Sequence, residues 1–193
     1  MDKFIPITTA VAIWLFLVKE CFEWGRRRKN KSNELRALKT LIYEEVKANS
    51  RPFRDFILFY EKLINNEIIR LNIQTSLKGI FIDYEDSDNI DKKYFFISKH
   101  SSKIIEKYLL DVSRVDQELT SKIIDLRICI DHFNEFILGG VEDCLGRNFK
   151  NNLTNELVKD LLVKNKLVIE EYRKLCNSVM SYCNIKQSNP YMI

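Results

Sequence analysis

A heptad pattern of apolar residues constrains the fold of this chain more than any other feature of its sequence. Over residues 105–137, apolar side chains recur at alternating spacings of four and three for more than four heptads, as in long helices that pack on other helices. A second apolar stripe widens this face and favours a helix within a bundle over a free coiled coil. The pattern predicts one helix over residues 101–138, ended by Gly139 and Gly140. The seam consists of Ile105, Leu109, Val112, Asp116, Leu119, Ile123, Leu126, Ile130, Phe133 and Ile137.

Helical periodicity also covers most of the remaining chain. Apolar stripes predict further helices over residues 32–50, 52–74 and 153–184. Pro52 separates the first two as a turn or only as a kink, because proline disfavours the helical conformation of the residue before it. Residues 79–97 interrupt the pattern with two apolar runs around an acidic, turn-forming stretch. This segment is either a short β-hairpin or an ordered loop packed on the bundle.

The composition agrees with an all-α fold. Only 5 glycines and 3 prolines occur in 193 residues, too few for the frequent turns of a β-sandwich or barrel. A hydrophobic content of 46% excludes a disordered chain. We therefore expect residues 32–185 to form an antiparallel helical bundle with one or two long helices. Residues 1–31 precede this domain, and residues 186–193 should form a flexible tail.

The N-terminal segment differs from the rest of the chain in its hydropathy. Phe4 to Val18 is a run of 15 residues without a charge, and a helix from Phe4 to Trp24 would span about 31 Å, close to the ~30 Å of a bilayer core. The alternatives are a single transmembrane helix, a cleaved signal peptide and a soluble or monotopic helix. We favour the transmembrane helix, because no small-residue cleavage site follows the run and four consecutive cations would be an unusual end for a core helix.

A basic cluster immediately follows Trp24 and consists of Arg26, Arg27, Arg28 and Lys29. Tryptophan favours the membrane interface, and basic residues favour the cytoplasmic side and anionic headgroups. Residues 1–31 carry the whole net charge of +4, while the basic and acidic residues of the remainder cancel. The pattern predicts a single-pass membrane protein with its N-terminus outside and its C-terminal domain cytoplasmic. It also predicts contact with anionic lipid but none with DNA.

The sequence predicts neither a metal nor a cofactor. An odd number of cysteines without C-x-x-C spacing suggests reduced thiols in place of disulfides or a zinc site. The chain lacks a Walker A loop, a dinucleotide-binding glycine motif, a nucleophile elbow and the His-Glu-x-x-His motif. The cysteines are Cys21, Cys129, Cys144, Cys176 and Cys183.

One short pattern has catalytic potential. Arg127 and His132 fit Arg-x4-His spacing and resemble the signature of HEPN ribonucleases, which are small all-helical bundles. The resemblance covers these two residues and the fold class. It implies that Arg127 holds phosphate and that His132 acts as an acid/base or positioning group in metal-independent RNA cleavage at a dimer cleft. The alternative is that both residues lie on the rim of the long helix without a catalytic role.

The favoured hypothesis is a non-enzymatic, membrane-anchored helical module for interaction or oligomerisation at the cytoplasmic face of a membrane. The seam would supply the interface with a protein partner or a second copy, and its one charged member, Asp116, would fix register at some cost in stability. Abundant Ile, Lys and Asn suggest a bacterial gene, and this layout fits an accessory or effector protein of an antiviral system by analogy. The alternatives are a HEPN-like ribonuclease, with RNA as its substrate, and a pore-forming membrane effector.

Overall fold

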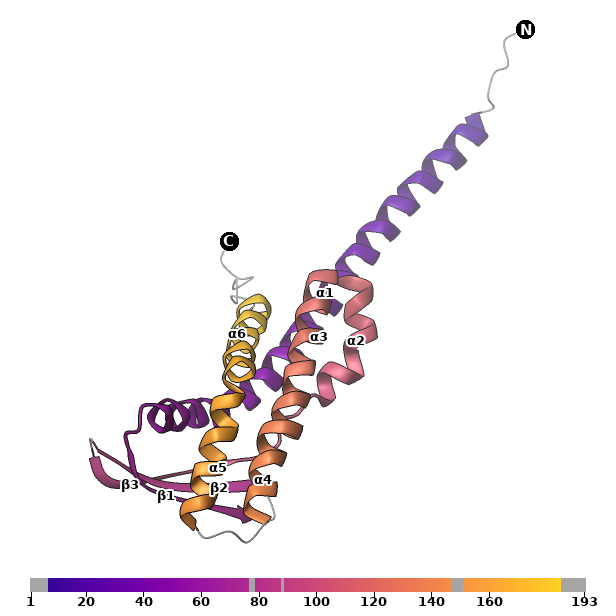
Figure 1. Cartoon of the computed structure of the whole chain (residues 1–193). Coiled ribbons are helices and arrows are strands. Elements are labelled where there is room, and N and C mark those ends of the chain that lie inside the picture. The colour runs from indigo at the N-terminus through magenta and orange to yellow at the C-terminus, as the bar shows by residue number, and fades with distance from the viewer. Residues whose placement is uncertain (1–6, 77–78, 88, 147–150, 185–193) are drawn as a thin grey trace.

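The computed structural model describes residues 7–76, 79–87, 89–146 and 151–184. Figure 1 shows a body in which helices lie beside one another above a small sheet, and an N-terminal helix that projects far beyond them. The helical elements are α1 (Ile7–Ile64), α2 (Lys103–Val115), α3 (Gln117–His132), the π-helix η1 (Phe133–Leu138), α4 (Gly139–Gly146), α5 (Asn151–Lys164) and α6 (Lys166–Cys183). The strands β1 (Ile68–Ser76), β2 (Gly79–Asp86) and β3 (Asn89–Ile97) form one antiparallel sheet in the order β1–β2–β3.

Helix α1 is a single element of 58 residues that continues through Pro52. Proline lacks an N–H and its ring clashes with the carbonyl four residues earlier, so a proline inside a helix kinks or breaks it. In Figure 1 the last part of α1, beside the sheet, runs in a different direction from the projecting part. The helix ends at Ile64, just before Asn66, which adopts a left-handed φ of 58°. The helix expected over residues 52–74 therefore stops early, and its final residues form strand β1.

The hairpin expected at residues 79–97 is present as β2 and β3, but the all-α fold class is wrong because β1 completes a sheet. Along β2, side chains alternate between buried and half-buried, which places Ile80, Ile82 and Tyr84 on the inner face. Phe59 of α1 covers this face, with its ring centroid 5.4 Å from that of Tyr84. A sheet with one covered face needs the alternating pattern that β2 shows.

The single helix expected over residues 101–138 is also wrong. Its chain breaks at Asp116, which has extended backbone angles of φ −151° and ψ 96° and separates α2 from α3. Gly139 and Gly140 do not end the following helix. Gly139 has right-handed helical angles of φ −59° and ψ −42°, and α4 continues to Gly146. The helix expected at 153–184 is likewise two helices, which meet at Asn165.

The apolar face of the predicted seam lies inside the chain's own core. α1, α3, α6 and the sheet contribute to one continuous cluster of buried side chains. The five apolar seam residues proposed as an interface are each 0% exposed and pack within the core of one copy. They are Leu119, Ile123, Leu126, Ile130 and Phe133.

The prediction of a transmembrane helix is wrong. Among the described residues, no helix combines the length and apolar character that crossing a bilayer requires. Within α1, the uncharged run extends only from Ile7 to Val18, about 18 Å, before Lys19, Glu20 and Glu23 interrupt it. The predicted single-pass localisation, with the N-terminus outside and a cytoplasmic domain, depends on such a helix and is therefore also wrong. Residues 1–6 and the predicted tail, 186–193, lie outside the described residues.

Candidate functional site

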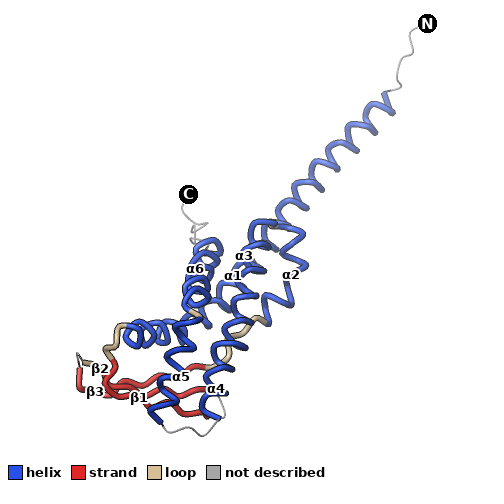
Figure 2. The backbone as a smooth tube through the Cα atoms, viewed as in Figure 1, coloured by secondary structure: helices blue, strands red, loops and turns tan. Residues whose placement is uncertain are grey.

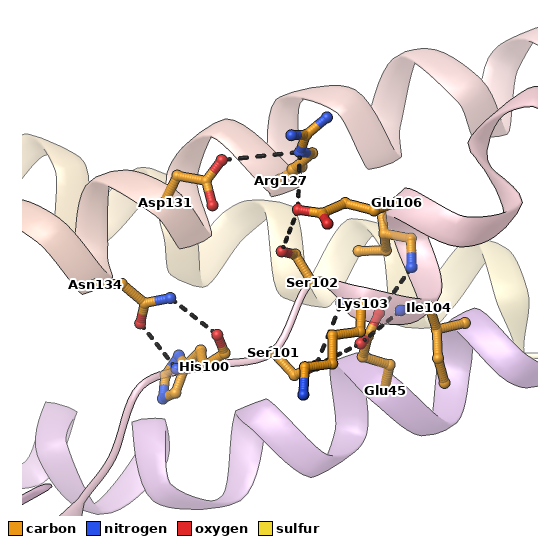
Figure 3. Close-up of polar contacts among 11 residues, drawn as sticks. Glu45, His100, Ser101, Ser102, Lys103, Ile104, Glu106, Arg127, Asp131 and Asn134 are labelled. Atoms are coloured by element: carbon orange, nitrogen blue, oxygen red, sulfur yellow. Dashed lines mark hydrogen bonds and ion pairs between the residues drawn. The ribbon is translucent and has the colours of Figure 1, made fainter.

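Two asparagine side chains hold the segment that joins β3 to α2. Asn134 of η1 accepts a hydrogen bond from the His100 N–H at 2.8 Å and donates to the His100 carbonyl at 2.9 Å (Figure 3). Asn49 of α1 binds Ser101 in the same way, at 2.9 Å and 2.7 Å. Each asparagine thus supplies the donor and acceptor that a neighbouring strand would otherwise provide. The entry into α2 is therefore fixed between α1 and η1.

Glu45 of α1 caps the N-terminus of α2. Its buried carboxylate accepts hydrogen bonds from the N–H groups of Ile104 and Ile105, each at 2.9 Å, and from the Ser101 hydroxyl at 2.7 Å. The first N–H groups of a helix lack intrahelical partners and carry partial positive charge, so a carboxylate there is stabilising. This arrangement could not be predicted from the sequence, because helix caps are sought among neighbouring residues.

Arg127, the first residue of the ribonuclease-like pair, lies in an ion-pair network on the α2 side of α3. Its Nε lies 3.4 Å from Glu106 and 3.8 Å from Asp131 (Figure 3). Glu106 also accepts a hydrogen bond from the Ser102 hydroxyl at 2.9 Å. The guanidinium therefore faces two carboxylates, and a phosphate would have to displace them.

His132, the second residue of that pair, lies on the α6 side of α3. Its ring packs against Phe136 with centroids 4.5 Å apart, and it lines a groove together with Leu167 and Val168. Five helical positions separate it from Arg127, a rotation of about 140° around the helix axis. The structure thus places the two residues towards different neighbouring helices.

A buried cluster of titratable side chains surrounds His100. Its Nδ1 lies 2.6 Å from the hydroxyl of Tyr172, and its ring stacks on Phe133 with centroids 4.7 Å apart. Burial lowers the pKa of His100 to about 4 and raises that of the Cys176 thiol to about 12. Burial likewise raises the pKa of Tyr172. All three groups are therefore neutral near pH 7. Phe53 and Phe133 pack against the rings of both His100 and Tyr172, which suits a structural role.

The described ranges hold no cluster of three or more His, Cys, Asp or Glu side chains arranged to bind a metal ion. All five cysteines are free thiols; Cys21 is exposed, whereas Cys176 and Cys183 are buried.

The projecting part of α1, residues 7–34, is called the arm below. Figures 1 and 2 show it as a straight helix that leaves the body without a neighbour. From Val11 to Glu34 every side chain except Val18 and Glu23 is exposed, and the first buried residue is Leu38. The large apolar residues that are more than half exposed there are Val11, Ile13, Trp14, Leu15, Phe16, Leu17, Phe22 and Trp24.

The basic cluster occupies the base of this arm. Arg27 pairs with Glu23 at 3.1 Å, and the Arg28 guanidinium lies 5.5 Å from the centroid of the Trp24 ring. Arg26 and Lys29 are exposed and have no ion-pair partner among the described residues. The arm is therefore apolar at its far end and carries free positive charge at the end nearest the body.

A second apolar surface lies on the body, between α3 and α6. It is a groove of about 340 Å³ with a predominantly apolar lining, called the α3–α6 groove below. Ile128 and Leu167 on its walls are 60% and 78% exposed, and Phe136 beside His132 is 57% exposed. The groove residues are Ile128, Cys129, His132, Leu167, Val168, Glu170, Glu171 and Lys174.

Comparisons with known proteins identify no relative. No family model matches the chain, and neither curated proteins nor solved structures contain a significant match. The class of protein that the fold and its surfaces define is a mainly helical α+β protein with an unpartnered apolar arm.

Proposed function

We propose that this protein is a non-enzymatic interaction module that assembles with copies of itself through its arm. The observation that carries this proposal is the exposure of apolar side chains on every side of the arm. Residues 13–17 are five consecutive apolar positions, and at 100° per residue they cover the full circumference of the helix. A helix that is apolar all round is normally buried.

The size of this surface also favours association. Fully burying one large apolar side chain contributes about 1.5–3 kcal/mol, and eight such side chains are exposed on the arm. Association costs on the order of 4–15 kcal/mol in lost freedom. Burial of most of the arm would offset that cost, whereas burial of one or two residues would not. The separation of Arg127 from His132 and the enclosure of His100 support a role without catalysis.

The molar mass of the full chain in detergent-free buffer, measured by light scattering or sedimentation over a range of concentrations, tests this proposal. We expect a mass above that of one chain. The double variant Trp14→Glu/Phe16→Glu should reduce it to one chain, because two charges cannot be buried in an apolar contact. Leu110→Glu is a matched control, since Leu110 is 72% exposed but lies on α2 of the body.

Two results would contradict self-assembly. One is a wild-type chain that stays monomeric at high concentration, including the case in which it binds vesicles of phosphatidylcholine and phosphatidylglycerol instead. The other is an arm variant that assembles as well as the wild type.

A further inference from the structure

We propose that the arm of one copy docks into the α3–α6 groove of a second copy. This inference rests on the proposed self-assembly and specifies the surface that the arm meets.

Shape and hydropathy match between the two surfaces. The arm presents a stripe at helical spacing that contains Val11, Leu15, Val18 and Phe22. The groove lies between two helices, and exposed Ile128 and half-buried His132 line its wall on α3. Ile124 and Phe136, both exposed, continue this four-residue spacing before and after them. An apolar helix face lying in an apolar groove between helices is a recurrent mode of recognition.

Charge also matches between them. The groove rim carries Glu170 and Glu171, whose contacts with Lys166 and Lys174 are loose, at 3.8 Å and 3.9 Å. Burial raises the pKa of the Cys129 thiol in the groove lining, and the nearby carboxylates of Glu171 and Asp125 raise it further. The base of the arm carries the free cations Arg26 and Lys29. Opposite charges at the rim of an apolar contact favour correct encounter.

The arm of a copy cannot reach the groove of the same copy. The arm and the packed part of α1 belong to one continuous helix that leads away from the body (Figure 1). Its 28 residues span about 42 Å, long enough to cover the roughly 33 Å of α3 and η1. An arm that fills the groove must therefore belong to another copy. Contact between two unlike surfaces produces a reciprocal dimer, a ring or an open filament.

The chain's own cysteines test this contact. Cys21 is exposed on the arm and Cys129 lines the groove. The assembled full chain, mixed from ¹⁴N- and ¹⁵N-labelled copies, is treated with a short bismaleimide, and its linked peptides are identified by mass spectrometry. We expect a Cys21–Cys129 link between differently labelled copies. Cys21→Ser or Cys129→Ser should abolish it, whereas Cys144→Ser, on α4, should leave it unchanged.

Groove variants separate this inference from the proposed function. Ile128→Glu and Leu167→Glu should each weaken self-association at least tenfold, whereas Leu110→Glu should not change it. If the arm variant abolishes assembly while both groove variants retain it, or if Cys21–Cys21 is the dominant link, self-assembly stands and docking in the groove is overturned. A monomeric wild-type chain would overturn both.

Discussion

The side chain of Asn134 binds the backbone of His100 at both of its hydrogen-bonding groups, accepting from the N–H at 2.8 Å and donating to the carbonyl at 2.9 Å. Asn49 repeats this arrangement at Ser101. Because Asn134 belongs to η1 and Asn49 to α1, the connection between β3 and α2 is tied to two helices that are distant in sequence. Movement of this connection would break hydrogen bonds to both.

Replacing Asn134 should destabilise the fold. In Asn134→Ala the N–H and carbonyl of His100 lose their partners in a site where water has little access, and we expect the free energy of unfolding to fall by about 2–3 kcal/mol. Urea denaturation followed by circular dichroism measures this change. Asn177→Ala is a control on the exposed surface of α6, where the change should stay within about 0.5 kcal/mol. Equal effects at both positions would contradict the role of Asn134.

The stability of the protein should depend on pH through His100. Burial lowers the pKa of His100 to about 4, whereas the unfolded chain titrates near its ordinary value of about 6.5. Between these values the unfolded state binds a proton that the folded state does not. The stabilising contribution is therefore complete above pH 6.5 and is lost as pH falls towards 4, to a maximum of about 3 kcal/mol.

Urea midpoints measured from pH 7 to pH 5 report this dependence. In the double variant His100→Phe/Tyr172→Phe, which also removes the hydroxyl that faces the imidazole, the decline should be shallower. An unchanged slope would assign the pH dependence to other groups.

Asp116→Leu should lower stability, although the sequence predicts the opposite. The Asp116 carboxylate accepts a hydrogen bond from the Leu119 N–H at 2.9 Å and another from the Tyr182 hydroxyl at 3.0 Å, and it lies 3.2 Å from the Lys39 ammonium. Leucine would remove the cap of α3 and leave Lys39 without its partner, so we expect a loss of about 2–4 kcal/mol. Asp116→Asn, which retains the cap, should lose less.

The pH dependence of this effect has a defined sign. Burial acts to raise the pKa of Asp116, but the bonds from Leu119, Lys39 and Tyr182 outweigh it and hold the pKa below its ordinary range. The contribution of Asp116 is thus complete above pH ~4 and is lost as pH falls through the lowered pKa. The difference in stability between wild type and Asp116→Leu should shrink in acid. A difference that stays constant down to pH 2 would contradict this.

Substitution by alanine should affect stability differently at the adjacent residues Gly139 and Gly140. A Cβ at Gly139 would have its nearest contact at 3.7 Å, and the backbone there is already helical. Gly139→Ala should therefore raise stability by about 0.5–1 kcal/mol. A Cβ at Gly140 would lie 2.9 Å from Cδ2 of Leu161, which must shift. We expect Gly140→Ala to be less stable than Gly139→Ala by about 1 kcal/mol in thermal or urea unfolding, and the reverse order would contradict this packing.

The sequence alone determined those features that depend on local pattern. Most of the apolar seam from Ile105 to Ile137 is buried, and the two apolar runs around an acidic stretch at residues 79–97 were compatible with the hairpin that forms there. The apolar run before Arg26 and the basic cluster identified the arm as unlike the rest of the chain. These features were readable because helical and strand periods show directly which face of an element is apolar.

Only the tertiary structure decided where elements break and what their polar groups contact. The apolar pattern predicted a helix over residues 52–74, whereas Ile68–Ser76 pairs with β2 as strand β1. Asp116 interrupts a seam that reads as continuous, because Lys39 and Tyr182, remote in sequence, surround its carboxylate. Glu45 caps a helix 59 residues further along the chain. Such contacts leave no periodic trace in the sequence, since they depend on which distant side chains the fold brings within hydrogen-bond distance.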